Sequence, residues 1–274
     1  MAGEEQLIVD QTSVILWMAY AYQKASGNTE WIKPYVPKLH VYADYLVSNG
    51  LFPASQKSSV DSIGATANQT ILAIYSAIGL TSFGALTGQA NYTAKGRAFA
   101  ATILELGISS DGTHILTHYN DSNSSWVSVY PFAWDKLTGL GTFNESTYAL
   151  ESAWYERELH PFGMPFYDGV NYTVSDLSLW CAATSSDEVR DALIDAVHLE
   201  YTSNLTSVPG PTQWNVVGAE IGVWRQTKAK AIAGSYSCLL QFDRRQVWTT
   251  KGRTIGHYPT YLPTYLKGLA LTSD

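Results

Sequence analysis

Charged residues are scarce in this sequence. Lysine, arginine, aspartate and glutamate make up 15 % of its 274 residues, and the 24 acids outnumber the 17 bases, which gives a net charge of −7 and a pI of about 5.3. Apart from a scatter of bases near the C-terminus there is no basic stripe, which argues against nucleic acid or an anionic membrane as a partner. With 46 % hydrophobic and 13 % aromatic residues, the chain has enough apolar surface for one large or two small folded domains.

Several motifs of catalysis and cofactor binding are also missing. No G-x-S-x-G, H-E-x-x-H or P-loop pattern occurs, so serine hydrolase, zinc protease and nucleotide-binding functions have no support. The two cysteines, Cys181 and Cys238, leave open either a disulfide bond or two free thiols. His114 and His118 have no third ligand in their neighbourhood, and we expect neither a metal site nor a cofactor.

Long hydrophobic runs are absent near the N-terminus. The apolar run from Val14 to Tyr22 is too short to span a bilayer, and no cleavage site precedes it, so we expect no signal peptide beginning at Met1. Yet the sequence has more N-x-S/T glycosylation motifs than chance would give, at Asn68, Asn91, Asn120, Asn123, Asn144, Asn171 and Asn204. This excess predicts a glycosylated, extracellular parent protein whose true N-terminus lies upstream of Met1.

Helical periodicity and capping residues dominate the pattern that is present. Nine helices are expected, at residues 10–25, 30–48, 61–86, 94–106, 130–137, 145–159, 173–183, 187–201 and 229–241. Alternation around a polar turn predicts one inserted β-hairpin over residues 114–129. Successive helices pair as αα-hairpins without visible repetition, which favours an all-α, (α/α)6 toroid over a regular solenoid. We expect this domain to cover residues 1–242 and an irregular tail to cover 243–274.

Six short segments carry a resemblance to a known family. They are His40-Val41-Tyr42-Ala43-Asp44-Tyr45-Leu46-Val47-Ser48-Asn49-Gly50, Ala67-Asn68-Gln69-Thr70, Trp134-Asp135-Lys136-Leu137-Thr138-Gly139-Leu140, Phe162-Gly163-Met164-Pro165, Tyr172-Thr173-Val174-Ser175-Asp176 and the region of Gly234. In order and spacing, over about residues 7–241, they resemble the C-terminal, six-hairpin-glycosidase-like part of the fungal glutaminase A family. No single segment is diagnostic, but the ordered set is fairly specific.

The resemblance implies both a function and a context. It implies an extracellular amidohydrolase that converts L-glutamine to L-glutamate and ammonia, with no cofactor. It also implies an N-terminal β-rich domain and the first toroid hairpins ahead of Met1, so that the toroid in this chain would be incomplete at its N-terminus.

Three acidic motifs of the family are each reduced by one carboxylate here. Where the family has V-E-E-[ST]-G-N-M, this sequence keeps one acid as Asp10 and has an amide at Gln11. The family's D-D-F-A-G is reduced to Asp61, and its W-Y-D stands as Gln213-Trp214-Asn215. Such losses indicate a divergent or weakened active site.

Four aspartates at or near predicted helix starts are the candidate catalytic residues. In a toroid the inner helices begin around one cavity, so carboxylates distant in sequence can converge there, and hydrolysis needs one group to activate water and one to protonate the leaving group. The candidates are Asp135, Asp61, Asp10 and Asp176. Asp135 is favoured because its aromatic neighbours would desolvate it and raise its pKa. The alternative for each is a structural helix-capping aspartate.

Substrate binding is expected from aromatic residues and one lysine. Trp134, Trp17 and Trp214 could wall a cavity, and Lys136 could hold a substrate carboxylate. The alternatives are core packing for the tryptophans and a solvated surface position for the lysine. Two other functions remain open: a glycoside hydrolase or carbohydrate-binding protein of the same toroid fold, and a non-catalytic remnant.

Overall fold

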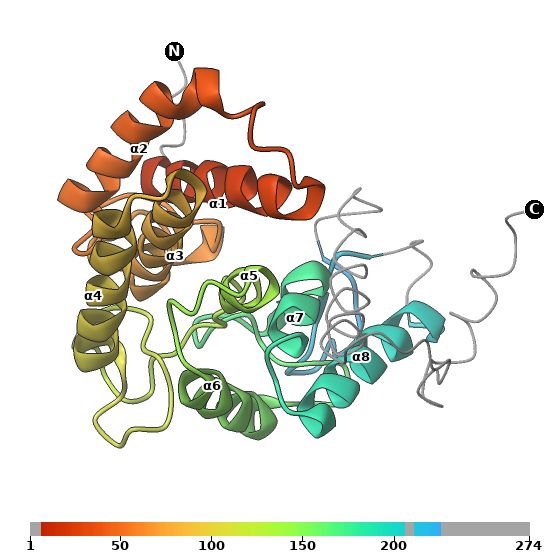
Figure 1. The fold of residues 1–274 in the computed structure, drawn as a ribbon. Coiled ribbons are helices and arrows are strands. Elements are labelled where there is room, and N and C mark those ends of the chain that lie inside the picture. The colour runs from red at the N-terminus through yellow and green to blue at the C-terminus, as the bar shows by residue number, and fades with distance from the viewer. Residues whose placement is uncertain (1–6, 206–210, 226–274) are drawn as a thin grey trace, which may run out of the picture. The chain divides into compact units, whose positions relative to one another are not determined.

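The computed structural model describes residues 7–205 and 211–225 (Figure 1). The helices are α1 (Ile8–Ser26), α2 (Val36–Asn49), α3 (Thr70–Thr87), α4 (Ala90–Gly107), α5 (Phe132–Thr138), α6 (Glu145–Glu158), α7 (Ser175–Ala182) and α8 (Asp187–Thr202), with 3-10 turns η1 (Lys33–Tyr35) and η2 (Asp61–Ile63). Within these ranges the sheet consists of β1 (Tyr172–Val174) and β2 (Gln213–Asn215). The all-α prediction is confirmed, while the helix expected at 229–241 and the tail at 243–274 lie outside the described residues.

Prolines set the start of the second helix. The chain leaves α1 through Gly27, whose φ of 68° is the left-handed conformation that glycine adopts at helix C-termini. The helix expected from residue 30 begins only at Val36, after the η1 turn that contains Pro34. Pro37 then lies in the first turn of α2, where its missing N–H leaves no helical hydrogen bond unmade.

α3 is the core helix of the described structure. All but two of its 18 residues are buried, and it is apolar around its whole circumference. Its length and composition would also suit a membrane span, but 89 % of that window is buried within the protein, as in the core helix of a globular domain. It packs on α1, α2 and α4.

The contact between α3 and α4 is close enough to require small residues. A Cβ atom placed on Gly96 of α4 would lie 2.6 Å from the carbonyl oxygen of Ala77 on α3. Glycine at this position therefore lets the two backbones approach, and Ala77 offers the matching small side chain. Small residues on α3 and α4 thus allow the two helices to pack closely.

The long helix expected from residue 61 is shorter than predicted. Residues 53–69 form an irregular segment that includes η2, and α3 begins only at Thr70. Gly64 and Asn68 take left-handed conformations, with φ of 79° and 58°, which interrupt a helix. The Gln69 side chain then ties the segment to itself by donating to the carbonyl oxygen of Gln56.

The β-hairpin predicted over residues 114–129 does not form. The segment makes only isolated bridges, among them Ile108 with Ile115 and Val127 with Tyr167. Backbone groups that a hairpin ladder would pair are bonded to side chains instead, since the Thr117 N–H donates to Ser125 Oγ. The antiparallel pair of strands lies elsewhere, with Thr173 of β1 opposite Trp214 of β2.

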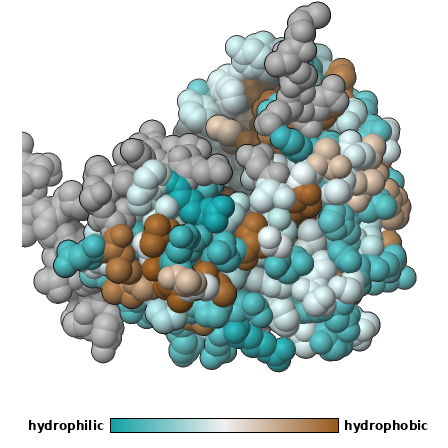
Figure 2. Space-filling view, turned by 180° about the vertical axis from the view of Figure 1, so that it is seen from behind, coloured by the Kyte–Doolittle hydropathy of each residue, from teal (hydrophilic) through white to brown (hydrophobic). Residues whose placement is uncertain are grey.

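The second half of the described chain follows the prediction more closely. Asn144 and Ser186 cap α6 and α8, each accepting a hydrogen bond from the backbone N–H three residues on, and both helices begin where expected. Hydrophobic side chains gather on the surface at the side of the molecule where α8 lies, as Figure 2 shows. On and just after α8, Leu199, Tyr201 and Leu205 are 40–53 % exposed.

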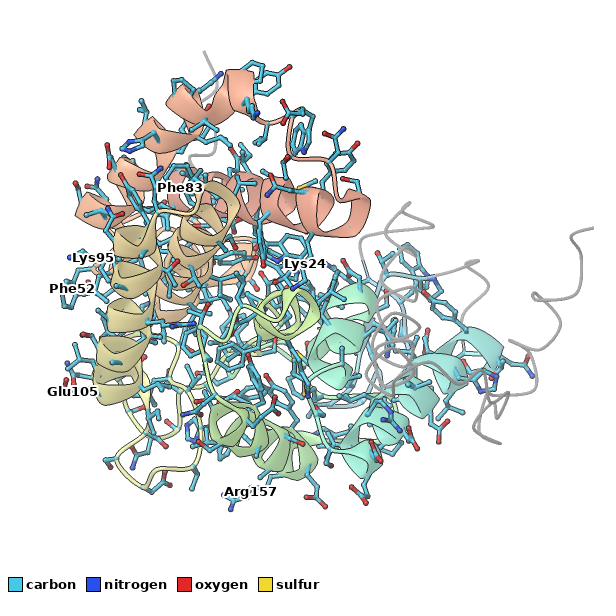
Figure 3. All side chains as sticks on the ribbon, in the orientation of Figure 1. Lys24, Phe52, Phe83, Lys95, Glu105 and Arg157 are labelled. Atoms are coloured by element: carbon cyan, nitrogen blue, oxygen red, sulfur yellow. The ribbon has the colours of Figure 1, made fainter. Side chains whose placement is uncertain are left out.

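Two helices from different halves of the chain hold α5. Lys24 reaches from α1 toward α5 (Figure 3), and its Nζ donates to the carbonyl oxygen of Thr138 at 2.5 Å. On the other side α5 packs on α7. The short helix thus lies between the first hairpin and the last, and its N-terminal end faces the polar residues described below.

One glutamate of α6 is buried in the core. Glu151 is 1 % exposed, and its Oε1 accepts the backbone N–H of Ile115 at 2.8 Å, while no hydrogen bond reaches Oε2. Burial raises the pKa of this carboxyl from 4.5 to about 8, with the Ile115 and Tyr155 hydrogen bonds opposing the shift. The folded chain therefore holds Glu151 as a neutral acid at neutral pH.

The stability of the chain should consequently fall as pH rises. Because the folded pKa lies above the unfolded value of about 4.5, the contribution is fully present below pH 4.5 and is lost up to about pH 8. Between pH 5 and 7 we expect a loss on the order of 2–3 kcal/mol in the free energy of unfolding. Urea titrations should show this slope in the wild type and a much flatter one in Glu151→Gln. Equal slopes in the two proteins would contradict a neutral Glu151.

Candidate functional site

Four polar side chains form a hydrogen-bonded array at the centre of the described structure. The backbone N–H of Ser59 donates to Asp10 Oδ2 at 2.8 Å. The Ser59 hydroxyl lies 2.8 Å from the hydroxyl of Tyr75 and 2.5 Å from that of Tyr130, and Tyr75 donates to Tyr130 at 2.8 Å. We call Asp10, Ser59, Tyr75 and Tyr130 the hydroxyl array. The three hydroxyls bond one another, and the Ser59 backbone N–H links them to the carboxylate.

The array is buried except at one member. Asp10 is 5 % exposed and the two tyrosines are each 2 % exposed, whereas Ser59 is exposed. Desolvation raises the pKa of Tyr75 and of Tyr130 above 10, and the nearby Asp10 carboxylate raises both further. Both hydroxyls therefore keep their protons at neutral pH and can act as donors, and the array meets solvent at Ser59.

Four separate parts of the chain supply the array. Asp10 lies in the first turn of α1, Tyr75 lies on α3, Tyr130 precedes α5, and Ser59 belongs to the irregular segment 53–69. That segment is fixed to α1 a second time, because the Val9 N–H donates to Gln56 Oε1 at 3.0 Å. The Val9 N–H of the first turn is satisfied in this way, and the two contacts together place the acid and the serine side by side.

A group of tryptophans adjoins the array. Trp17 and Trp134 stack with ring centroids 4.8 Å apart, and the Trp17 indole N–H donates to the Trp134 carbonyl oxygen. Trp134 also meets the ring of Tyr75 edge-on at 5.0 Å and that of Trp180 at 6.4 Å. Trp17 and Trp180 are half-buried. The structure thus brings together the predicted residues Asp10, Trp17 and Trp134.

Asp135 has a different environment from the one expected. It is completely buried, with Oδ1 accepting the Thr142 N–H at 3.0 Å and Oδ2 accepting the Phe143 N–H at 2.8 Å and the Tyr148 hydroxyl at 2.7 Å. Both oxygens are therefore used to hold the turn between α5 and α6. This contact is structural, but it is not the helix-capping role given as the alternative, because the donors follow α5. The aromatic neighbours of Asp135 pack around a carboxylate that is already satisfied.

Three other predicted site residues, Asp61, Asp176 and Lys136, lie on η2, α7 and α5. Asp61 begins η2, and Asp176 is half-buried in the first turn of α7. Lys136 Nζ lies 3.8 Å from Glu145 Oε2 and over the ring of Tyr148 rather than facing the array.

Trp214 is fully buried rather than lining a cavity. It packs with Leu179, Val197 and Val216, and its indole N–H donates to the Phe162 carbonyl oxygen at 2.8 Å. This is the core packing that the sequence left open as an alternative for the tryptophans.

Two members of the array were not identified from the sequence. Tyr75 lies in a run of small and apolar residues, where a tyrosine reads as core packing, and Ser59 belongs to a serine-rich loop without a motif. Tyr130 stands five residues before Asp135, and in the sequence it is one of that acid's aromatic neighbours and nothing more. The signal that could have found them is the proximity of their hydroxyls, which becomes visible only in three dimensions.

The part of the chain that the structure describes contains no cluster of side chains that could bind a metal ion. No group of three histidine, cysteine or acidic side chains converges in residues 7–205 and 211–225. His114 is buried and stacked on Trp154 with ring centroids 3.7 Å apart. Cys181 is a buried free thiol, and Cys238 lies outside the described residues.

The arrangement defines a helical domain with an internal acid and hydroxyl site. A buried carboxylate can accept a proton from water, and tyrosine hydroxyls that stay protonated can donate to a developing oxyanion. These are the two capacities that hydrolysis of an amide or ester requires. The fold is all-α, and the array places groups with both of these capacities close together.

Comparison with known proteins identifies the family. The sequence model described as "Glutaminase A six helical-hairpin domain" matches residues 1–240, and the chain belongs to this family. It is 27 % identical over 203 residues to glutaminase A of Aspergillus oryzae (strain ATCC 42149 / RIB 40). The aligned region is 71 % of this chain and 29 % of that relative, so the chain spans less than a third of the relative's length.

Replacing Asp135 should cost stability. In Asp135→Asn an amide NH2 must face one of the donors at Oδ1 or Oδ2, so at least one hydrogen bond is lost and a buried donor is left unpaired. We expect a loss of about 2–4 kcal/mol in the free energy of unfolding. Asp195→Asn, at an exposed position on α8, is the matched control and should change it by no more than about 0.5 kcal/mol. Equal urea midpoints for the two variants would contradict the structural role.

Proposed function

We propose that the chain is the helical part of a hydrolase that converts L-glutamine to L-glutamate and ammonia. The observation that carries the proposal is the hydroxyl array, in a chain of the glutaminase A six helical-hairpin family. A buried carboxylate accepts the backbone N–H of Ser59, whose hydroxyl is bonded to two tyrosine hydroxyls. The Aspergillus relative is named glutaminase A, and the substrate is taken from that name. No cofactor is needed for this reaction.

Asp10 is the proposed general base. Its carboxylate would take a proton from water as the water oxygen attacks the side-chain amide carbon of glutamine. The tetrahedral oxyanion would accept hydrogen bonds from the tyrosine hydroxyls or from Ser59. Asp10 would then return the proton to the nitrogen as the C–N bond breaks, which yields ammonia and the carboxylic acid of glutamate.

This assignment changes the weight of the predicted residues. Asp10 replaces Asp135 as the principal acid/base candidate. Asp135 is proposed to stabilise α5 by binding the backbone of the turn that follows it. Asp61 and Asp176 remain candidates for a second acid. With Gln11 and Asn215 in place of family acids, fewer carboxylates are present to share the two proton transfers, and we expect a weakened enzyme.

The tryptophan group favours a second candidate function. Trp17 and Trp180 are half-buried and both pack on Trp134, which contacts Tyr75 of the array, and aromatic faces suit the apolar face of a sugar. A glycoside hydrolase or carbohydrate binder would be stabilised by sugars and not by glutamine in a thermal-shift panel. The reverse result would favour glutamine.

Secretion and glycosylation of the parent protein are part of the proposal. The asparagines of all seven N-x-S/T motifs are exposed in the structure. Surface exposure is what an acceptor site in a secreted protein requires. We further propose that an extracellular parent carries the β-rich N-terminal domain implied by the family resemblance, with a small molecule as substrate and neither nucleic acid nor membrane as a partner.

Substitution of Asp10 tests the hydrolase. Ammonia release from L-glutamine should fall about 100-fold or more in Asp10→Asn, because general-base catalysis typically contributes that much. In Tyr130→Phe the rate of ammonia release should fall by a smaller factor. In Asp195→Asn, at an exposed position on α8, the rate should equal that of the wild type. If the wild type itself releases no ammonia, the chain is the non-catalytic remnant. Activity that survives Asp10→Asn would remove Asp10 from the mechanism.

Mass spectrometry can test glycosylation. The protein would be expressed with a secretory leader in a eukaryotic host and deglycosylated enzymatically in H₂¹⁸O, which converts each formerly glycosylated asparagine to ¹⁸O-labelled aspartate. We expect the label at several of the seven motifs and none at Asn28 and Asn49, which are exposed but lack the motif. Absence of label at every motif would contradict the proposal.

A further inference from the structure

The chain reverses direction after β2 and brings Arg225 alongside that strand. The backbone N–H of Arg225 donates to the carbonyl oxygen of Gln213 at 2.8 Å, and that of Asn215 donates to the carbonyl oxygen of Val223 at 3.0 Å. β2 is in turn paired with β1, where Tyr172 stands opposite Asn215. The backbone of Arg225 is therefore fixed beside two strands, and its side chain starts from a defined position.

Neutral groups hold the side chain of Arg225. Its Nη1 donates to Asn171 Oδ1 at 3.3 Å and to Asn215 Oδ1 at 3.2 Å, and its guanidinium carbon lies 4.7 Å from the centre of the Tyr172 ring. Asn215 is 3 % exposed, while Arg225 itself is half-buried. Two amide oxygens and an aromatic ring orient a guanidinium without cancelling its charge.

Arg190 on α8 shows the contrasting arrangement. It is also half-buried, but Asp187 Oδ1 lies 2.6 Å from its Nη1, and Asp191 Oδ1 lies 2.9 Å from both its Nε and its Nη2. In residues 7–205 and 211–225 no carboxylate makes such a pair with Arg225. The positive charge of Arg225 is therefore uncompensated by its described neighbours, whereas that of Arg190 is paired.

One edge of the Arg225 guanidinium is unused. A guanidinium has five N–H groups in a planar fork. Both side-chain contacts of Arg225 come from Nη1, and in the part of the chain that the structure describes its Nε and Nη2 donate to no acceptor. Nε–H and the Nη2–H beside it are parallel, which is the geometry that binds both oxygens of a carboxylate. We call these two groups the Nε/Nη2 edge.

We propose that the Nε/Nη2 edge of Arg225 binds the carboxylate of a small ligand. A carboxylate is planar and carries one negative charge, so it matches both the fork and the single charge of Arg225. A phosphate monoester carries about 1.5–2 negative charges at neutral pH. Glu220, whose Oε2 accepts from Asn215 Nδ2 at 3.4 Å, already adds a negative charge beside the amide that holds Arg225. A carboxylate therefore balances the site better than a phosphate.

Tyr172 connects this site with the hydroxyl array. Its hydroxyl donates to Ser62 Oγ at 3.0 Å, and Ser62 follows Ser59, the array member that meets solvent, within the same irregular segment. On the proposed function, the bound group is the α-carboxylate of glutamine, which the reaction leaves unchanged, or the carboxylate of a second ligand beside the substrate. The carboxylate site itself rests only on the contacts of Arg225.

Proton–nitrogen NMR of the Arg225 Nε–H group tests the site. The chain would be produced in a bacterial host, which attaches no glycan to Asn171, and titrated with sodium acetate against sodium chloride at constant ionic strength. Loss of a signal in Arg225→Gln identifies the Arg225 resonance. We expect acetate to shift it saturably and to leave the Nε resonance of Arg190 in place, because Asp191 already occupies that edge. Sodium phosphate should bind more weakly than acetate.

Asn215→Asp provides a charge test that keeps the arginine. It places a carboxylate on Nη1, where the amide oxygen now lies at 3.2 Å, and so compensates the charge of Arg225 from within the chain. Acetate should then bind at least about tenfold more weakly. Asn49→Asp, at the exposed end of α2, adds the same charge to the chain and should leave the affinity for acetate unchanged.

Ammonia release from L-glutamine distinguishes the two sources of the carboxylate. If KM rises at least about tenfold in Arg225→Gln with kcat unchanged, the site binds the substrate's own carboxylate. If KM is unchanged while the wild type binds acetate at Arg225, the site serves a second carboxylate ligand. A wild type that releases no ammonia would refute the proposed function and leave the NMR titration valid.

Three results would overturn the proposal. The first is an Arg225 Nε resonance that acetate does not shift, or shifts no more than that of Arg190. The second is equal affinity for acetate in the wild type and in Asn215→Asp. The third is tighter binding of phosphate than of acetate, which would assign the edge to a different class of anion.

Discussion

Burying a carboxylate away from water is the constraint on which this structure most depends. The chain has few charges, yet Asp10, Asp135 and Glu151 are each no more than 5 % exposed. A buried carboxylate requires donors that satisfy its oxygens or a proton that neutralises it. Asp135 has two backbone N–H groups and a tyrosine hydroxyl, Glu151 has one backbone N–H and retains its proton, and Asp10 has the Ser59 N–H at the edge of a group of hydroxyls.

These three solutions separate structural from chemical roles. The donors around Asp135 come from the turn that follows it, so the carboxylate and the turn stabilise each other. The donors near Asp10 are themselves linked to one another and reach the surface at Ser59, which leaves them able to turn toward a ligand. Aromatic neighbours are common to both aspartates and do not distinguish them. The identity and origin of the hydrogen-bond donors do.

Local signals predicted the helices better than they predicted the site. The starts of α6 and α8 follow from capping residues that act within four positions, and the closely packed α3 and α4 follow from small residues. The prediction of a β-hairpin at 114–129 was wrong because side-chain acceptors such as Ser125 take the place of backbone acceptors on a partner strand. The alternation of residue types in the sequence cannot reveal this exchange of acceptors. Asp10, Trp17 and Trp134 were identified from helix starts and composition. Ser59 and Tyr75 were not, because their role depends on contacts between residues 16 or more positions apart.

The position of α5 has a consequence for how the molecule assembles. The stronger helix contacts fall into two local groups, α1 to α4 and α5 to α8, with α1 and α5 making contact between them. Contacts of short sequence separation form early in folding, so each group can organise before the two meet. The hydroxyl array draws Asp10, Ser59 and Tyr75 from the first group and Tyr130 from the second. The array is therefore complete only when the two groups of helices have docked. A chain in which each group had folded separately would have its helices but no assembled site.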